Sequence, residues 1–161
     1  MSKHQKNAAL DFMTRPQMSK YKEQFSEYLF LKDLMLAAAK KNTELAVSRT
    51  DFDSFGFDLM LSVRDQERKW RSVRVQLKST FKHTRWDVHK SLIEDPDGRI
   101  VVIRLRSDNQ EITPEYLLFD RNCASIALAR VPKVPHPAKC QVRLGNSEFV
   151  EIKDDLLRIF K

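Results

Sequence analysis

The chain has 161 residues, of which 42% are hydrophobic and 32% charged, and this composition is typical of one soluble globular domain. No apolar run approaches the roughly 18 residues that span a membrane, and the N-terminal sequence lacks the apolar core of a secretory signal, so we expect a cytoplasmic protein without a membrane partner. The formal net charge of +7 instead favours an anionic partner.

The N-terminal third predicts an arm, a long helix and a first strand. Residues 1–18 are polar and contain a proline, which predicts a loose arm or a short helix ahead of a single domain over residues 19–161. Hydrophobic residues then recur at spacings of three and four through residues 19–41, the pattern of an amphipathic helix, with Ser19 as its N-cap. Residues 44–50 predict a short strand.

The rest of the chain predicts a sheet and short helices. Residues 57–63 and 71–79 flank a charged turn, which predicts a β-hairpin. Further strands are predicted at 100–106, 116–120 and 141–144, short helices at 122–130 and 153–160, and an extended Pro-rich segment at 131–137. A helix, then a mostly antiparallel or mixed sheet, then one or two helices predicts an α/β or α+β fold.

Alternation along the hairpin decides which side chains share a face. Residues Val73, Val75 and Leu77 point one way, so Gln76 and Lys78 point the other way. In the first hairpin strand, the apolar set leaves Asp58 on the side away from the core. The sequence therefore predicts one polar face that contains Asp58, Gln76 and Lys78.

Glu27 is the fourth polar residue of interest, and it lies on the long predicted helix. Offsets of four, seven and eleven residues align it with Leu31, Leu34 and Ala38 on the core-facing stripe. An uncompensated charge there would destabilise the fold by on the order of several kcal/mol. No Lys or Arg stands three or four residues away, so we expect a metal ion or Lys78 to be its partner.

These residues have the chemistry of a Mg²⁺ or Mn²⁺ site. Magnesium prefers hard oxygen ligands, and Asp58, the side-chain carbonyl of Gln76 and the backbone carbonyl of Leu77 offer three. Lys78 would orient or activate a water molecule and stabilise developing negative charge, and Glu27 would hold a metal-bound water or a second ion. Asp51 or Asp53 is an alternative to Asp58 as the metal acid.

Positive charge concentrates around this predicted site. Residues 62–90 contain nine Lys or Arg against three Asp or Glu, which accounts for +6 of the net charge. We interpret the excess as a footprint for phosphate groups, although a solvated basic face is the plain alternative. The candidate contacts to the DNA backbone are Arg64, Arg71, Arg74, Lys82 and Arg85. Trp70 and Trp86 flank the second hairpin strand and either pack in the core or stack on bases.

The order Glu27, Asp58, Gln76-Leu77-Lys78, with the phrases SEYLFLKDLMLAAAKK, FGFDLML and VRVQLKST, resembles the PD-(D/E)XK nuclease superfamily. It is similar to small archaeal Holliday-junction resolvases and to intron-encoded homing endonucleases with a Gln-x-Lys ending, and the resemblance covers about residues 19–80. It implies a restriction-endonuclease-like core, in which helices flank a central mixed β-sheet. It also implies metal-dependent cleavage of DNA, structure-specific or site-specific, by a homodimer or homotetramer.

The chain departs from the superfamily pattern at two positions. No proline precedes Asp58, and Gln76 replaces the usual acid, which removes one negative charge from the metal site. Two other functions therefore stay open. One is a catalytically inactive nuclease-fold protein that binds nucleic acid or acts as an assembly module. The other is an interaction module whose basic hairpin binds an acidic protein.

Overall fold

The computed structural model describes residues 8–50, 56–108, 111–131, 141–152 and 155–161. Some sequence predictions fall outside these residues. They are the alternative metal acids Asp51 and Asp53, most of the Pro-rich segment 131–137, and the first two residues of the predicted C-terminal helix. Within the described residues, no helix is long and apolar enough to cross a membrane.

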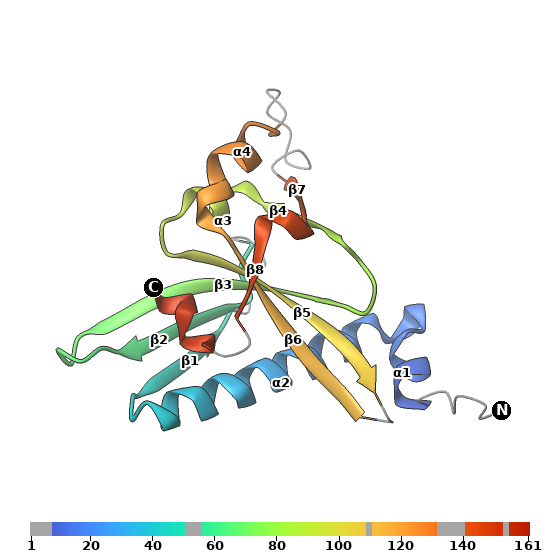
Figure 1. The fold of residues 1–161 in the computed structure, drawn as a ribbon, viewed down its shortest axis with the longest axis horizontal. Coiled ribbons are helices and arrows are strands. Elements are labelled where there is room, and N and C mark those ends of the chain that lie inside the picture. Colours follow the sequence, from blue (N-terminus) through green and yellow to red (C-terminus); the bar gives the residue numbers. More distant parts are fainter. Residues whose placement is uncertain (1–7, 51–55, 109–110, 132–140, 153–154) are drawn as a thin grey trace.

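The structure confirms the predicted α+β fold with a mixed central sheet (Figure 1). The strands are β1 (Leu45–Arg49), β2 (Leu59–Arg64), β3 (Trp70–Thr80), β4 (Arg85–His89), β5 (Gly98–Asp108), β6 (Glu111–Phe119), β7 (Gln141–Gly145) and β8 (Phe149–Glu151). The α-helices are α1 (Ala8–Met13), α2 (Ser19–Lys40), α3 (Lys90–Glu94) and α4 (Ala124–Leu128). Short 3-10 helices are η1 (Pro16–Met18), η3 (Arg121–Cys123), η5 (Asn146–Glu148) and η6 (Leu156–Phe160).

The strands form a six-stranded sheet in the order β1-β2-β3-β5-β6-β8 and a two-stranded sheet of β4 and β7. Strands β1, β2 and β3 pair antiparallel, β3 pairs parallel with β5, and β5 pairs antiparallel with β6. The predicted hairpin is confirmed as β2 and β3, which extend away from the rest of the protein (Figure 1). Its register places Leu59 opposite Val75.

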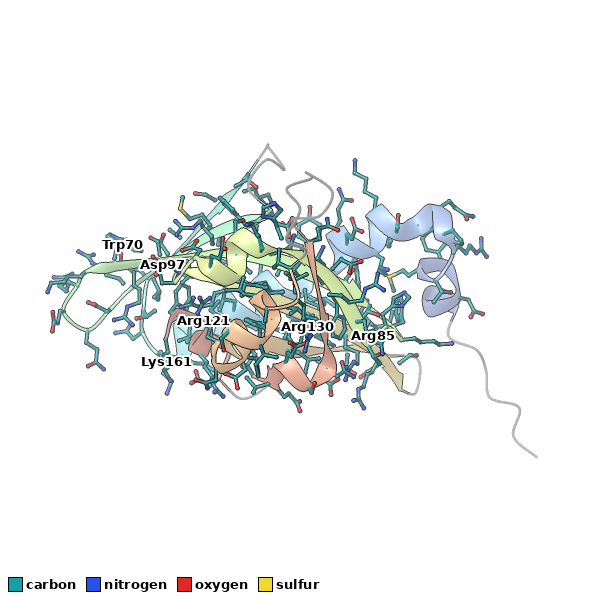
Figure 2. All side chains as sticks on the ribbon, turned by 90° about the horizontal axis from the view of Figure 1, so that it is seen from above. Trp70, Arg85, Asp97, Arg121, Arg130 and Lys161 are labelled. Atoms are coloured by element: carbon teal, nitrogen blue, oxygen red, sulfur yellow. The ribbon has the colours of Figure 1, made fainter. Side chains whose placement is uncertain are left out.

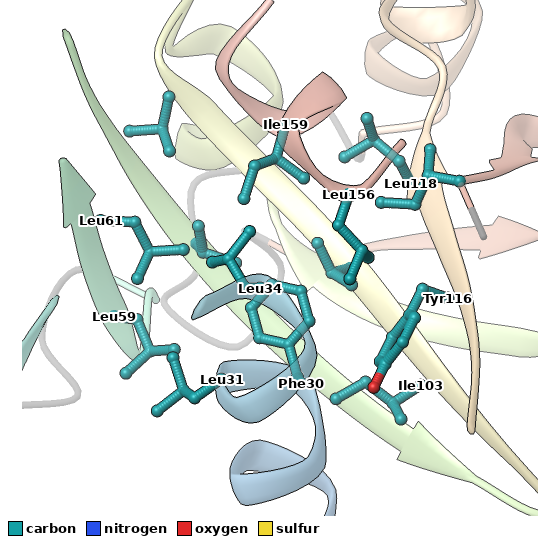
Figure 3. Close-up of a cluster of buried hydrophobic side chains, with 14 of the residues drawn as sticks. Phe30, Leu31, Leu34, Leu59, Leu61, Ile103, Tyr116, Leu118, Leu156 and Ile159 are labelled. Atoms are coloured by element: carbon teal, nitrogen blue, oxygen red, sulfur yellow. The ribbon is translucent and has the colours of Figure 1, made fainter. Parts of the chain in front are cut away.

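Different elements pack against the two faces of the large sheet. On one face α2 packs its apolar stripe against β2, β3, β5 and β6, as Figure 3 shows for Phe30, Leu34 and Leu61. The other face is covered by α3, α4 and the small sheet. There Ile100 of β5 packs with Val88 and Val142, one from each strand of that small sheet. Side chains on one face of β3 therefore lie toward α2, and those on the other face lie toward α3, α4 and the small sheet.

The long helix has the predicted extent but not the predicted N-cap. Ser19 is its first helical residue, and the cap position is held by Met18, whose side chain makes no capping bond. The turn of η1 explains this difference, because the Ser19 N–H already donates to the carbonyl of Pro16. At the other end Asn42 has φ of 51°, a left-handed conformation that Asn tolerates. Its N–H donates to Ala39 and that of Thr43 to Ala38, which closes the helix.

Several short elements were not predicted. Strands β4 and β8 and helix α3 have no more than five residues each, and the predicted C-terminal helix is the 3-10 helix η6. The pairing of β4 with β7 places Trp86 opposite Leu144. Such segments carry too few residues for a periodic pattern, so their structure depends on tertiary partners.

Candidate functional site

The candidate site lies where β2 begins and β3 continues past it. Asp58 directly precedes β2, and its backbone N–H donates to the carbonyl of Val75 at 2.9 Å. The Asp58 carboxylate accepts a hydrogen bond from the Leu77 backbone N–H at 2.6 Å. This side chain therefore replaces the ladder partner that β2 does not supply, and it holds a negative charge against the middle of β3.

Gln76 directly precedes Leu77 on β3, and its side chain lies on the face of the strand that also bears Lys78. Its side-chain oxygen Oε1 is buried and has no hydrogen-bond partner among the described residues. A buried acceptor without a partner costs about 1–3 kcal/mol, and its presence calls for an explanation such as an ion or a water molecule. Of the predicted metal ligands, Asp58 and Leu77 are therefore in direct contact.

Glu27 reaches the same region from α2. It lines a cavity of about 220 Å³ with Asp58, Leu77 and Ser79, and the other lining residues, all on α2, are Lys20, Glu23, Gln24 and Ser26. Leu31, Leu34 and Ala38 are buried, as the core-facing stripe predicted. The structure thus places the helix carboxylate and the strand carboxylate at one cavity.

The partner of Glu27 is a residue that the sequence did not indicate. Arg49, the last residue of β1, donates from Nε to Glu27 Oε1 at 2.7 Å, and the Glu27 side chain is 23% exposed. This hydrogen bond, with the attraction between the two charges, raises the pKa of the Arg49 guanidinium. Arg49 therefore takes the place that was predicted for Lys78 as the charged partner of Glu27, and the metal ion stays a prediction. No local signal could reveal Arg49, because it is 22 residues away and reaches Glu27 only through the position of β1.

Lys78 and Gln76 share a face of β3, as predicted, and that face is turned away from α2. Asp58 instead lines the cavity on the α2 side, so the prediction that it shares one face with Gln76 and Lys78 is wrong. The register pairs Gln76 with Ile100 and Lys78 with Val102, whose side chains belong to the clusters on the β4–β7 side. Lys78 is not among the residues that line the cavity of Glu27 and Asp58. Its charge contributes to lowering the pKa of Asp87 in β4, after the larger effect of the hydrogen bond from Arg143.

The basic residues of the predicted footprint do not form one patch, because they lie toward opposite ends of β3. Three of its five arginines and lysines bind other parts of the protein: Arg64 pairs with Glu44 at 3.1 Å, Arg71 donates to the carbonyl of Phe160 at 3.1 Å, and Arg74 pairs with Asp95. Lys82 and Arg85 are exposed and lie beyond the other end of the strand. Figure 2 shows this separation between Trp70 and Arg85. Clustering in the sequence did not produce one patch because an extended strand spreads its residues over a long distance.

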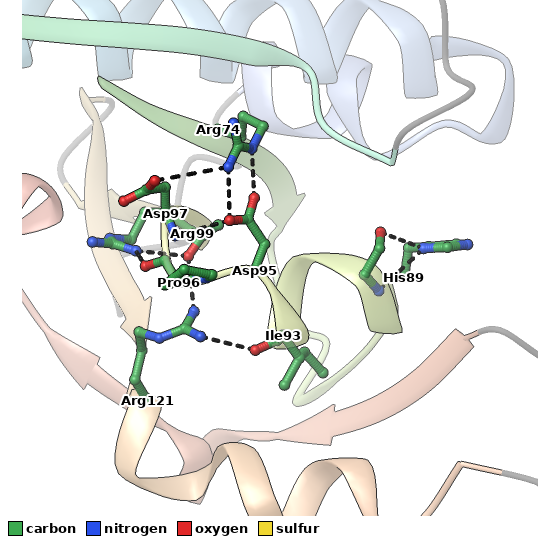
Figure 4. A network of polar contacts seen from close by, with 10 residues as sticks. Arg74, His89, Ile93, Asp95, Pro96, Asp97, Arg99 and Arg121 are labelled. Atoms are coloured by element: carbon green, nitrogen blue, oxygen red, sulfur yellow. Dashed lines mark hydrogen bonds and ion pairs between the residues drawn. The ribbon is translucent and has the colours of Figure 1, made fainter. Parts of the chain in front are cut away.

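Arg74 belongs to a network that holds the turn between α3 and β5 (Figure 4). Its Nη2 donates to Asp95 Oδ1 at 2.7 Å, and this pairing lowers the pKa of Asp95. Arg99, almost fully buried, donates to the carbonyl of Ile159 at 2.7 Å. Gly98 is required at the turn, since a Cβ there would lie 2.3 Å from the carbonyl oxygen of Leu92. The interactions of Arg74 are therefore structural.

The predicted metal ligands are oxygen atoms, which suit a hard cation, but they carry little negative charge. The described residues contain no group of three or more His, Cys, Asp or Glu that could hold a metal ion. The predicted set differs from such groups because it combines the Asp58 carboxylate with the amide oxygen of Gln76 and the carbonyl of Leu77. These are ligands that Mg²⁺ accepts. The pairing of Glu27 with Arg49 offsets part of the negative charge at the cavity, which Glu23 and Asp58 also line.

Comparison of the chain with models of protein families, with curated proteins and with solved structures finds no match. The assignment of a function therefore rests on the residues of the site and on their chemistry.

Proposed function

We propose that the protein is a metal-dependent endonuclease that hydrolyses phosphodiester bonds in DNA with Mg²⁺ or Mn²⁺. The observation that carries this proposal is the cavity that Glu27 and Asp58 both line, where the Asp58 carboxylate accepts a hydrogen bond from the Leu77 N–H. Carboxylate oxygens at one cavity are the hard ligands that a divalent cation prefers, and a cation would also remove the desolvation cost of the buried amide oxygen of Gln76. The mixed central sheet flanked by helices supports the same proposal.

Each residue of the site has a role in this proposal. Asp58, Gln76 and the Leu77 carbonyl would hold the ion. When bound, it lowers the pKa of a coordinated water and withdraws charge from the phosphate. Lys78, two residues beyond Gln76 on the same face, provides positive charge for the phosphate or orients the attacking water. Glu27 contributes a second carboxylate at the cavity, and Arg49 holds it in place.

A protein that binds DNA without cleaving it is the second candidate. The observation that favours it is the ion pair between Arg49 and Glu27, which satisfies the helix carboxylate without a metal. Together with the glutamine at position 76, this reduces the negative charge that is available to attract a divalent cation. The two candidates differ in what Lys78→Ala does: the nuclease loses cleavage, whereas the binding protein keeps its DNA affinity and has no cleavage to lose.

The test is a cleavage assay on supercoiled, linear and branched DNA, each with Mg²⁺, Mn²⁺ or EDTA. We expect nicking or cutting that requires the metal and is abolished by Asp58→Ala and by Lys78→Ala. Matched controls are Asp155→Ala and Lys32→Ala, which remove an exposed acid and an exposed lysine away from the site. Cleavage that survives both site substitutions would refute the assigned residues, and its absence from every substrate would support the binding protein.

We also propose that the active form is a homodimer or homotetramer. Each chain offers one candidate site, so cutting both strands of a duplex or a four-way junction is simplest with two copies related by symmetry. Light scattering at the concentration of the cleavage assay measures the mass directly. A monomeric mass under conditions in which both strands are cut would contradict this proposal.

A further inference from the structure

The side of α2 that faces away from the sheet carries a row of side chains that we call the outer α2 stripe. Its members recur at alternating spacings of four and three residues: Tyr21, Phe25, Tyr28, Lys32, Met35 and Ala39. At about 3.6 residues per turn these positions share one face, opposite Phe30 and Leu34, which pack against the large sheet (Figure 3). The helix therefore has two largely apolar faces, of which one faces the core.

The apolar members of the stripe are more exposed than packing within one chain explains. Tyr28, Met35 and Tyr21 are 64%, 59% and 51% exposed, and Leu36 beside them is 54% exposed. They are four of the eight large hydrophobic side chains that are exposed in the described part of the chain. A helix that is apolar on both faces is ordinarily buried on both, and neighbouring exposed apolar side chains mark an interaction surface. The stripe therefore calls for a partner that packs along α2.

A second copy of α2 fits this stripe when the two helices run antiparallel about a twofold axis at the level of residue 30. The members of the stripe then face one another in three kinds of pair: Tyr21 with Ala39, Phe25 with Met35, and Tyr28 with Lys32. The first pair sets a large ring against a methyl group. The second sets a half-buried ring against a thioether, and the third sets a tyrosine ring against an ammonium group. The stripe is therefore complementary to itself.

We propose that the outer α2 stripe is the interface of a homodimer in which two copies of α2 pack antiparallel. This inference goes beyond the proposed function, because the pairing requires neither DNA nor a metal ion. A parallel pair would place each Lys32 against its own copy. The antiparallel register separates the two lysines by four residues, about 6 Å along the helix axis, and it also aligns the helix dipoles favourably.

The area of the stripe is sufficient for such a dimer. At roughly 200 Å² per large side chain, the exposed fractions of the four large apolar residues leave about 450 Å² of surface. This is more than half of the about 800 Å² per partner that a stable interface buries. Lys32, with 60% of its side chain exposed, and the exposed Gln24 and Ala39 add to it. A lipid surface fits less well, because α2 carries three acids beside its four lysines, whereas a helix that lies on a membrane has a basic polar face.

The first test measures mass by light scattering, in EDTA and without DNA, at concentrations from about 1 to about 200 µM. We expect the wild type to approach twice 18.9 kDa. Met35→Glu should raise the Kd of the dimer by at least about 100-fold, because each dimer would bury two uncompensated carboxylates. Ile126→Glu is the matched control: Ile126 is also 59% exposed but lies on α4, so this variant should dimerise as the wild type does. The far-UV circular dichroism of both variants should match that of the wild type.

Two results would overturn the interface. One is a wild type that stays near 18.9 kDa over the whole range. The other is a folded Met35→Glu that dimerises as tightly as Ile126→Glu. Lys32→Ala should keep the dimer, because the pair of Tyr21 and Ala39 already combines a ring with a methyl group. A dimer that does not cleave DNA supports this inference and counts only against the proposed function.

Cysteine cross-linking tests the register. In a chain that also carries Cys123→Ser and Cys140→Ser, an equal mixture of Tyr28→Cys and Lys32→Cys should form disulfide-linked dimers on mild oxidation, faster than either variant alone. Facing positions on two packed helices bring the Cα atoms within reach of a disulfide. Tyr21→Cys mixed with Lys32→Cys is the control, since these positions are about 10 Å out of register. Equal rates in the two mixtures would overturn the antiparallel pairing.

Discussion

Asp58 has two separable roles, and two substitutions distinguish them. Its carboxylate accepts the Leu77 N–H at 2.6 Å in a half-buried position. Asp58→Ala removes this charge-assisted hydrogen bond, which is worth about 1.5–3 kcal/mol. For a chain of this length, the loss lowers Tm by about 3–12 °C. Asp58→Asn keeps an oxygen that accepts from Leu77, so we expect a smaller loss of about 0.5–1.5 kcal/mol.

The metal role, unlike the structural role, predicts the same effect for Asp58→Ala and Asp58→Asn. With Mg²⁺ at roughly tenfold its Kd, the wild type should gain about 1.4 kcal/mol of stability, and both variants should lose this gain because neither has the charged ligand. Differential scanning fluorimetry with Mg²⁺ and with EDTA measures both quantities. A Mg²⁺-dependent rise in Tm that persists in Asp58→Asn would refute Asp58 as a metal ligand. An equal loss of stability in both variants would refute the structural role of its accepting oxygen.

Three further predictions concern the stability of the fold. Tyr116→Phe removes the hydrogen bond from a buried hydroxyl to Asp33 at 2.7 Å, and urea unfolding should show a loss of about 1–2 kcal/mol, because water can still solvate the partly exposed carboxylate. Asn42→Val places a β-branched residue in the left-handed conformation and should cost about 1–2 kcal/mol in the same assay, whereas Asn42→Gly should change stability by less than about 0.5 kcal/mol. The pKa of Asp95 is lowered by Arg74, so its contribution to stability is present above the ordinary value of 3.8 and is lost as the pH falls through the lower value of the folded state. Acid unfolding of Asp95→Asn should therefore depend less steeply on pH below 3.8 than that of the wild type, and an unchanged slope would contradict this assignment.

The sequence was sufficient for the elements that carry a long periodic pattern. The apolar residues of α2 recur at helical spacing over its 22 residues, and the stripe with Phe30, Leu31 and Leu34 packs on the sheet. The hairpin of β2 and β3 was predicted from alternation around a charged turn, and its register follows from burial of one face. These features depend on neighbours within the same element, so the order of residues along the chain determines them.

The short elements and their partners could not be predicted in this way. Strand β4 has five residues and pairs with β7, more than fifty residues later in the chain. Its burial pattern exists only because the small sheet covers one face of the large one. Short segments gain most of their stability from such packing, which leaves little local signal.

Some features of the candidate site also follow from the sequence alone, whereas others depend on the tertiary structure. The sequence by itself determined the acid before β2, the Gln-Leu-Lys order on β3 and the common face of Gln76 and Lys78, since alternation is a property of one strand. Only the tertiary structure decided that Arg49 pairs with Glu27, that the basic residues separate along β3 and that Trp70 stays exposed while Trp86 is buried. These outcomes depend on which distant elements pack together. The reason is physical: a strand sets the direction of its side chains, but the energy of each side chain depends on the charges and surfaces that other elements bring to it.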